Sequence, residues 1–537
     1  MKIGKIINDC IPTRSNIDMG TNVIAMIVDT LSGRSPLYHV EKFYQDMDTE
    51  LLFGFPISPK SFNDDALGRT LDRISTYGTQ KLFTSISLQV VKDYNIDISQ
   101  GNYDTTSVNV WGEYDSSSAK VNTPHITHGY SKDKRPDLKQ FMVSMLCAEG
   151  NIPISGKMQD GNASDTKLNN EELQRVSKLL SPLKQESGDF IYVADCKLVT
   201  PDNLDLLTNT KFISRLPSNY KEHQRAIDEA LNTNQWFTIG ELAETPSHSQ
   251  KRIRSSYQSH DTTVNIEGVS YRASVIRTDQ LDKRKTKGIE RRKEKQKVLL
   301  GREIKKLNKL TYFCAEDAKK ALEQHISKNS NKYWRLTGEV YSRKIYAKGR
   351  PAKSGERKPA KIEYKLDLHL EADTDYYEIE RSRAGCFVLI SNIPSSDIEA
   401  KKLLKTYKSQ YGIEQNFSFL KEPLIVNDTF IKTPSRIDAL VMILLLSLLV
   451  WNLIQRQLRN SKECKEGKLH DLNKRPTNRP TCYLFVQNLR NIMIMKRGNE
   501  RCLARNKLRD QPRHYLQALG LDETCYTTPA NQPIRQT

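Results

Sequence analysis

The most constraining feature of the sequence is a strand-like segment that carries a carboxylate on its apolar face. Turn-forming residues at 99–102 precede alternating β-forming residues at 103–110, which is the pattern of a β-strand. Asp104 shares a face with Val108 and Val110, so its carboxylate is expected to point inward. Burying a carboxylate costs several kcal/mol unless it is paired or binds a cation. The segment alone equally fits an edge strand with a solvated Asp104.

The chain from residue 98 to residue 217 alternates strand and helix patterns in an informative order. A short turn joins two apolar runs and predicts a hairpin. A later run is almost continuously apolar and ends on Asp195, as is typical of a buried parallel strand. The expected elements are strands at 103–110, 140–148 and 152–158, a helix at 165–183, a strand at 190–195, a second helix and a strand at 211–216.

Composition narrows the possible partners and the compartment. The chain has 537 residues, enough for several domains with their own cores, and a formal net charge of +19. A protein this basic usually binds a polyanion, with nucleic acid the first expectation and a membrane surface the second. The nine cysteines form no Cys-x-x-Cys pair, and the first residues lack a signal-peptide apolar run. We therefore expect a reducing, cytoplasmic setting, without a structural zinc site.

The first 97 residues have helical patterns. Asn63 is a natural N-cap, and the acidic pair Asp64 and Asp65 suits the first turn of the helix that follows. We interpret this pair as helix-start chemistry rather than as a catalytic dyad. A helical domain that contacts DNA fits residues 1–97, although nothing in these residues requires DNA contact.

The uncharged apolar run at residues 439–455 is the one stretch that suggests a membrane. It is shorter than the roughly 20 residues that a bilayer span needs. It also contains Ser447 and Asn452, and basic residues follow it at once. We expect a fully buried core helix, and no membrane partner.

Residues 218–384 contain strand-like pieces at 263–275, 333–346 and 361–369 around a very basic helical segment, 283–309. Runs of charged residues often form solvated faces, but the excess charge of this segment is of one sign, positive. Neutralising DNA phosphates releases counterions and gives salt-sensitive binding. DNA contact is therefore favoured for this segment, and its candidate DNA-binding residues are Arg291, Arg292 and Lys295.

A third carboxylate lies in a predicted long helix that starts at Ser395–Asp397 and runs to Lys421, after a buried strand at 386–392. Tyr407, Glu414 and Lys421 are seven positions apart, so they should project along one helix face.

If this helix packs on the sheet, Asp104, Asp195 and Glu414 offer three hard oxygen ligands of the kind that hold Mg²⁺. Two such ions can clamp the attacking and leaving oxygens of a phosphoryl displacement.

At this point the sequence resembles the DDE transposases of bacterial insertion sequences, in the branch with a Tyr-x2-Arg-x3-Glu-x6-Lys signature. The resemblance covers roughly residues 15–460. It is carried by Tyr-Asp-Thr-Thr-Ser at 103–107, His-Gly-Tyr-Ser-Lys-Asp-Lys-Arg-Pro-Asp-Leu-Lys-Gln at 128–140, Gly-Asn-Ala-Ser-Asp at 161–165, Val-Ala-Asp at 193–195, and the Tyr407/Glu414/Lys421 helix. Each piece alone is weak, whereas five in order are specific.

The resemblance implies an α/β fold, with a ribonuclease-H-like catalytic core of a mixed sheet flanked by helices, a helical N-terminal domain, and a β-rich basic insertion before the last catalytic helix. The expected domains are 1–97 (helical), 98–217 (first part of the core), 218–384 (insertion), 385–460 (second part of the core) and 461–537 (basic C-terminal extension).

The same resemblance implies site residues, cofactor and partners. Asp104, Asp195 and Glu414 would be catalytic and would bind two Mg²⁺ ions, with Mn²⁺ as a substitute. Tyr407 and Lys421 would contact DNA phosphate near the cleaved end, with Lys132 and Arg135 as further DNA contacts. Partners would be double-stranded DNA, both the element's inverted-repeat ends and the target, and a second copy of the chain in the synaptic complex. The setting would be the cytoplasm of a prokaryotic cell, close to the nucleoid.

One residue departs from the signature. Gln410 stands where the signature has Arg, so a hydrogen-bonding amide replaces a charged, bidentate group. The leading hypothesis is a transposase that cleaves DNA and joins the 3′-hydroxyl to a target. The alternatives are a nuclease without strand joining and a catalytically inactive DNA-binding relative on the same core.

Overall fold

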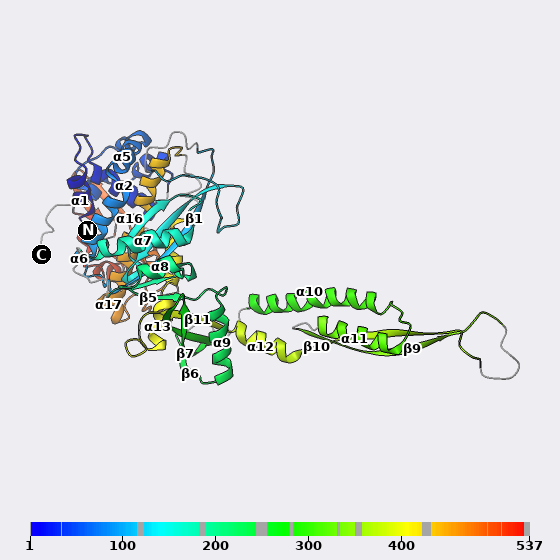
Figure 1. Ribbon diagram of the computed structural model, residues 1–537. Helices are drawn as coiled ribbons and strands as arrows, with labels where there is room; N and C mark the ends of the chain where they lie inside the picture. Colours follow the sequence, from blue (N-terminus) through cyan, green and yellow to red (C-terminus); the bar gives the residue numbers. More distant parts are fainter. Residues whose placement is uncertain are drawn as a thin grey trace. The chain divides into compact units, whose positions relative to one another are not determined.

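The computed structural model describes most of the chain (Figure 1). The described residues are 2–33, 35–114, 123–181, 189–242, 255–279, 283–329, 333–349, 357–421, 431–490, 492–505 and 507–530. They form two compact units, which are treated separately below. Unit 1 comprises Met1–Pro217 and Ser391–Thr537, and unit 2 comprises Ser218–Ile390.

Unit 1 begins with helices, as the sequence predicted. They are α1 (Ile3–Cys10), α2 (Met19–Ser32), α3 (Val40–Tyr44), α4 (Thr49–Phe53), α5 (Asp64–Tyr77) and α6 (Thr79–Asp93). Asn63 caps α5, because its Oδ1 accepts a hydrogen bond from the Ala66 backbone N–H at 2.9 Å. Leu67 and Leu71 on that helix are completely buried, so they form its inner, apolar face.

The core of unit 1 is a five-strand arrangement. The strands are β1 (Gln100–Val110), β2 (Lys139–Cys147), β3 (Pro153–Gln159), β4 (Ile191–Ala194) and β5 (Lys211–Arg215), in the order β3-β2-β1-β4-β5. The first three pair antiparallel, whereas β1, β4 and β5 pair parallel. Helix α7 (Asp165–Leu180) follows β3, and α8 (Pro201–Leu206) follows β4. This mixed sheet with flanking helices is the predicted ribonuclease-H-like core.

Helix α16 (Pro434–Asn460) is the long apolar helix of unit 1. Among the described helices it alone is long and apolar enough to cross a membrane by length and composition, but 72% of its most apolar window is buried inside the protein. Its polar groups are satisfied internally, because Ser447 donates to the Ile443 carbonyl and Asn452 donates to the Asn416 side chain. The structure therefore agrees with the expected core helix, which packs on α2, α5, α6 and β3.

The long helix predicted from Ser395–Asp397 to Lys421 starts later, at Ala400, and a two-residue turn at Ser409 and Gln410 divides it. The chain forms α13 (Ala400–Lys408) and α14 (Tyr411–Leu420), with Glu399 as the N-cap residue of α13. At this turn, the Ser409 hydroxyl lies within hydrogen-bond distance of the Thr406 carbonyl and of Asn102 Oδ1 on β1. Gly412 approaches Asn151 so closely that a Cβ there would lie 2.0 Å from its side chain. Ser409 and Gln410 keep right-handed helical torsion angles, so the backbone stays helical through this turn.

The C-terminal part of unit 1 is more ordered than a weakly structured extension. It contains α17 (Lys462–Lys465), α18 (Cys482–Leu489), the antiparallel strands β12 (Ile494–Arg497) and β13 (Glu500–Leu503), and α19 (Asp510–Gln517). Leu458, Leu469 and Tyr515 form a buried cluster. Arg501 on β13 forms salt bridges with Asp48 and Glu50 of the N-terminal helices, at 2.7 and 2.6 Å. Sequence patterns did not predict the β12–β13 hairpin, because the sequence-distant partners of Arg501 help to hold it.

Unit 2 contains a hairpin region and a long ribbon. Its elements are α9 (Lys221–Thr233), β6 (Phe237–Glu241), β7 (Ser256–Ile266), β8 (Val269–Thr278), α10 (Lys283–Leu307), α11 (Ala315–Asn329), β9 (Trp334–Ile345), β10 (Lys361–Ala372), α12 (Thr374–Ala384) and β11 (Cys386–Ser391). The predicted single piece at 263–275 is instead parts of β7 and β8, because Glu267 and Gly268 both have positive φ and make a tight turn. Helices α10 and α11 pack along the antiparallel β9–β10 ribbon (Figure 1).

Candidate active site

The two predicted aspartates of the sheet lie next to each other. Strands β1 and β4 run parallel with Tyr103 opposite Ala194, so the next residue on each chain is an aspartate, Asp104 and Asp195. The Asp104 carboxylate accepts from the Thr105 backbone N–H at 2.7 Å. The Asp195 carboxylate accepts from the Lys197 backbone N–H at 3.0 Å, as an N-cap residue does. The sheet register therefore places both carboxylates side by side.

The aspartate pair is partly buried, and both of its carboxylates have a raised pKa. Burial raises the pKa of Asp104 to about 6, and the negative charges of Asp195 and Asp165 add to the rise while Lys132 opposes it. Burial also raises the pKa of Asp195, with a further contribution from Asp165. Because these carboxylates are costly to ionise together, the site favours a cation beside them.

Asp165 is a third acidic residue near the pair, and sequence reasoning gave it no role. It is the first residue of α7, where its Oδ1 accepts from the Thr105 hydroxyl. Lys132 Nζ lies 3.5 Å from Asp165 Oδ1 and donates to the Thr105 carbonyl oxygen at 2.6 Å. The signal that could have found Asp165 is its place at the start of the helix after the β2–β3 hairpin.

Glu414 lies on α14, the helix that packs on β1, the strand of Asp104. It is exposed on α14, and it is not among the main groups that shift the pKa of Asp104 or Asp195. Within the described residues, no three His, Cys, Asp or Glu side chains are grouped to hold a metal ion. Yet α14 does pack on the core, because Asn416 on its inner face donates to the Asn151 carbonyl at 2.9 Å.

Two other predicted site residues, Tyr407 on α13 and Gln410 in the turn after it, have different surroundings. Tyr407 is partly buried; burial raises its pKa to about 12, and Asp195 and Asp104 contribute, so its hydroxyl lies near the aspartate pair. Gln410 Nε2 is buried without a hydrogen-bond partner among the described residues. The two-residue turn lies between Tyr407 and Glu414, and the common face predicted for them stays a prediction.

The loop at 128–137 connects these parts of the site. Lys421 Nζ forms a salt bridge with Asp133 of this loop at 2.8 Å. Arg135 binds Asp137 through two guanidinium nitrogens and lies over the Trp111 ring at 5.1 Å. Lys132, as described above, faces the acidic residues. The loop therefore places one cation at the carboxylates and holds the Lys421 ammonium with an acid.

The predicted basic residues of unit 2 lie on α10. Arg291, Arg292 and Lys295 are exposed. Arg292 lies 3.6 Å from Glu380 and donates to the Tyr333 hydroxyl, so part of its charge is compensated within the unit. Arg291 and Lys295 are four residues apart and share a helix face with Arg302 and Lys306. This face is a one-signed basic stripe.

Two family models match the chain. Residues 112–450, more than half of its length, match the family described as "Transposase DDE domain", and residues 1–88 match a domain of unknown function. No curated protein matches. Among solved structures, the "Mos1 transposase paired-end complex with left transposon end" is similar at 13% identity, covering 41% of this chain and 68% of that chain. Its TM-score of 0.16 is too low to support an argument.

Proposed function

This chain belongs to the transposase DDE domain family, which places its activity in DNA transposition, and from that premise we propose a specific mechanism. The chain binds the ends of its mobile element, cleaves the phosphodiester there and joins the free 3′-hydroxyl to target DNA. The observation that carries this proposal is the adjacent, charge-repelling pair Asp104 and Asp195 on β1 and β4. Such a pair is suited to binding divalent cations through hard oxygen ligands.

Asp104 and Asp195 would hold the metal, and Glu414 would be the third ligand. When bound, two Mg²⁺ ions, or Mn²⁺ in their place, supply charge stabilisation to the attacking and leaving oxygens of the in-line displacement. Glu414 is exposed on α14, which packs on β1, so its carboxylate would be open to a metal ion and to DNA.

The chain's own cations and donors would position the DNA. We propose that Lys132, Tyr407 and Gln410 face the phosphate at the cleaved end, where the unpartnered Gln410 amide would find an acceptor. DNA phosphate would replace Asp133 as the partner of Lys421. Arg135 would contact the flanking backbone.

The basic stripe of α10 would contact the DNA backbone further from the cleaved bond, through Arg291, Arg292 and Lys295. Such contacts carry no sequence information and add salt-dependent affinity. We also propose that two copies act together on the two ends. The domains assigned to these tasks keep the boundaries 1–97, 98–217, 218–384, 385–460 and 461–537.

The test is cleavage of the element's own end DNA by the full chain with Mg²⁺. Asp104→Asn should abolish strand cleavage while DNA binding stays within about twofold, because the amide keeps the shape but not the anionic ligand. The matched control is Asp93→Asn, an exposed carboxylate at the end of α6, which should cleave like the wild type. Normal cleavage by the Asp104 variant would refute the assignment.

A second candidate is a DNA-binding relative that no longer cleaves. Two observations favour it, the exposure of Glu414 and the replacement of the signature Arg by Gln410. This candidate predicts that the wild-type chain binds DNA equally well with Mg²⁺ or with a chelator and makes no break. Restoring the signature by Gln410→Arg would then leave cleavage absent.

A further inference from the structure

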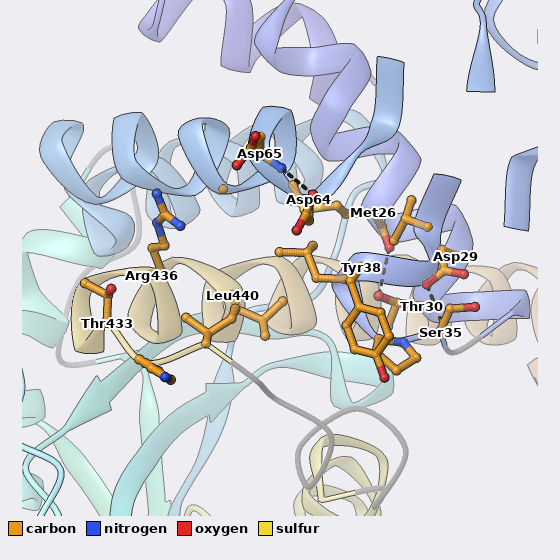
Figure 2. Close-up of a pocket in the computed structure, with 16 residues that line it drawn as sticks. Met26, Asp29, Thr30, Ser35, Tyr38, Asp64, Asp65, Thr433, Arg436 and Leu440 are labelled. Atoms are coloured by element: carbon orange, nitrogen blue, oxygen red, sulfur yellow. Dashed lines mark hydrogen bonds between the residues drawn. The ribbon is translucent and has the colours of Figure 1, made fainter. Parts of the chain in front are cut away.

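A separate cavity of about 330 Å³ lies in unit 1, far along the sequence from the acidic residues described above. It is bounded by α2, by the segment around η1 (Leu37–His39), by the first turns of α5 and by the start of α16. Figure 2 shows α5 above and α16 below, with the Arg436 side chain between them. This volume falls in the range of small-molecule sites.

The cavity has apolar walls that suit an organic body. Met26, Leu37, Val40 and Leu440 line it, together with the partly exposed ring of Tyr38. An ion that prefers only oxygen ligands would leave these walls uncovered, whereas an organic molecule would bury them. Apolar area removed from water contributes roughly 25 cal/mol per Å² to binding.

A buried acid stands at one end of the cavity. Asp29 is 2% exposed, and burial raises its pKa to about 6. Its Oδ2 accepts from the Ser35 backbone N–H at 3.1 Å, but its Oδ1 has no hydrogen-bond partner among the described residues. A buried carboxylate oxygen without a partner is costly, so a donor supplied by a ligand would relieve that cost. Figure 2 shows Asp29 and Ser35 together, next to Tyr38.

The remaining charged residues of the lining are two acids and two bases. Asp64 and Asp65, at the start of α5, form no salt bridge with a described residue, although Asp65 contributes electrostatically to the raised pKa of Arg436. Arg436 is already held by both carboxylate oxygens of Asp72, at 2.8 and 2.7 Å, so it offers little to an anion. Lys432 is the other basic residue of the lining. The cavity therefore favours a cation, although the whole chain is strongly basic.

We propose that this cavity binds a small organic cation, a primary ammonium or guanidinium group on an apolar body. The cationic group donates to the free Oδ1 of Asp29, and the apolar body lies between Tyr38, Met26 and Leu440. A bound ligand would touch both α2 and α16, so it would brace the N-terminal helices against the core helix. The proposal is independent of the transposase mechanism.

The experiment uses 2-phenylethylamine as the cationic probe and 2-phenylethanol as its neutral match, with the full chain and calorimetric titration at pH 7.5. The amine should bind at least about tenfold more tightly than the alcohol, because a hydrogen bond to a charged, buried group is worth more than one to a neutral partner. Asp29→Asn should reduce amine binding by about tenfold and leave alcohol binding unchanged.

A second variant keeps the test decisive if Asp29→Asn folds poorly. Leu440→Trp should fill the cavity and remove binding of both probes, and the matched change Val298→Trp on the exposed face of α10 should remove neither. Equal binding of the amine and the alcohol to the wild type would overturn the proposal. So would an amine that binds the Asp29 variant as tightly as the wild type, or no amine binding at millimolar concentration.

Discussion

Two carboxylates of unit 1, Asp104 on β1 and Asp29 on α2, both have a pKa that burial raises to about 6, but their neighbours differ. Asp104 lies among charged groups, repelled by Asp195 and Asp165 and attracted by Lys132. Asp29 is moderated only by its hydrogen bonds to Ser35 and has an apolar cavity beside it. A raised pKa therefore identifies burial, and only the neighbours distinguish a cation-binding cluster from a single unpaired acid.

A third carboxylate supports this lesson. Burial raises the pKa of Asp438 on α16 to about 6 as well, but its Oδ2 accepts from the Thr79 hydroxyl at 2.8 Å. No second acid is among the causes of its shift. The pKa value alone would thus rank three residues equally, although only Asp104 is shifted by neighbouring acids.

The largest expected effect separates Asp195 from Asp29. Asp195→Asn should reduce DNA strand cleavage on the order of 10³-fold or more, because it removes a proposed metal ligand. Asp29→Asn should change cleavage by less than about twofold. Single-turnover cleavage of end DNA with Mg²⁺ measures both. Comparable losses of cleavage in the two variants would show that Asp195 and Asp29 do not have different roles in cleavage.

The next effect concerns Asp165, which contacts the Thr105 hydroxyl and lies near Lys132. Asp165→Asn should weaken Mn²⁺ binding to the full chain by roughly tenfold, as loss of a group that orients metal ligands commonly does. The pKa of Asp104 should fall, since one like charge is removed. Electron paramagnetic resonance of Mn²⁺ measures the affinity without any DNA. Asp160→Asn, which alters a loop contact to the His125 backbone N–H, is the control. Unchanged Mn²⁺ affinity in the Asp165 variant would limit that residue to a structural role.

A smaller effect is expected on stability. The folded chain binds the Asp29 proton more tightly than the unfolded chain, so the stability it contributes below pH 3.8 is lost as pH rises through about 6. Asp29→Asn should therefore raise the free energy of unfolding at pH 7 by about 1–2 kcal/mol, and by close to zero at pH 4. Urea unfolding at both pH values measures this difference. A variant that is destabilised at pH 7 would show that the carboxylate has a favourable partner.

The smallest effect tests exposed charge in place of buried charge. Lys295→Gln on α10 should make the negative slope of log affinity for DNA against log salt concentration less steep by about 1. Affinity at low salt should fall by a few-fold. Glu294→Gln, its exposed neighbour, should not make that slope less steep. Fluorescence anisotropy across a salt series measures both. An unchanged slope for the Lys295 variant would show that the basic stripe is a solvated helix face that does not contact DNA.

Local patterns in the sequence determined the core of this protein. Alternation placed Asp104 on the inner side of a strand, an apolar run ended on Asp195, and the run at 439–455 became part of α16. These features need only the neighbouring residues, because strand and helix periods are set by the backbone. The order of strands and helices between residues 98 and 217 followed from the same patterns.

The tertiary structure alone decided the parts that depend on distant residues. The turn between α13 and α14 coincides with the contacts of Ser409 with Asn102 and of Gly412 with Asn151. The place of Asp165 beside the aspartate pair depends on how α7 packs against β1. Contacts between residues hundreds of positions apart have no periodic signal in the sequence, so only the folded chain could reveal them.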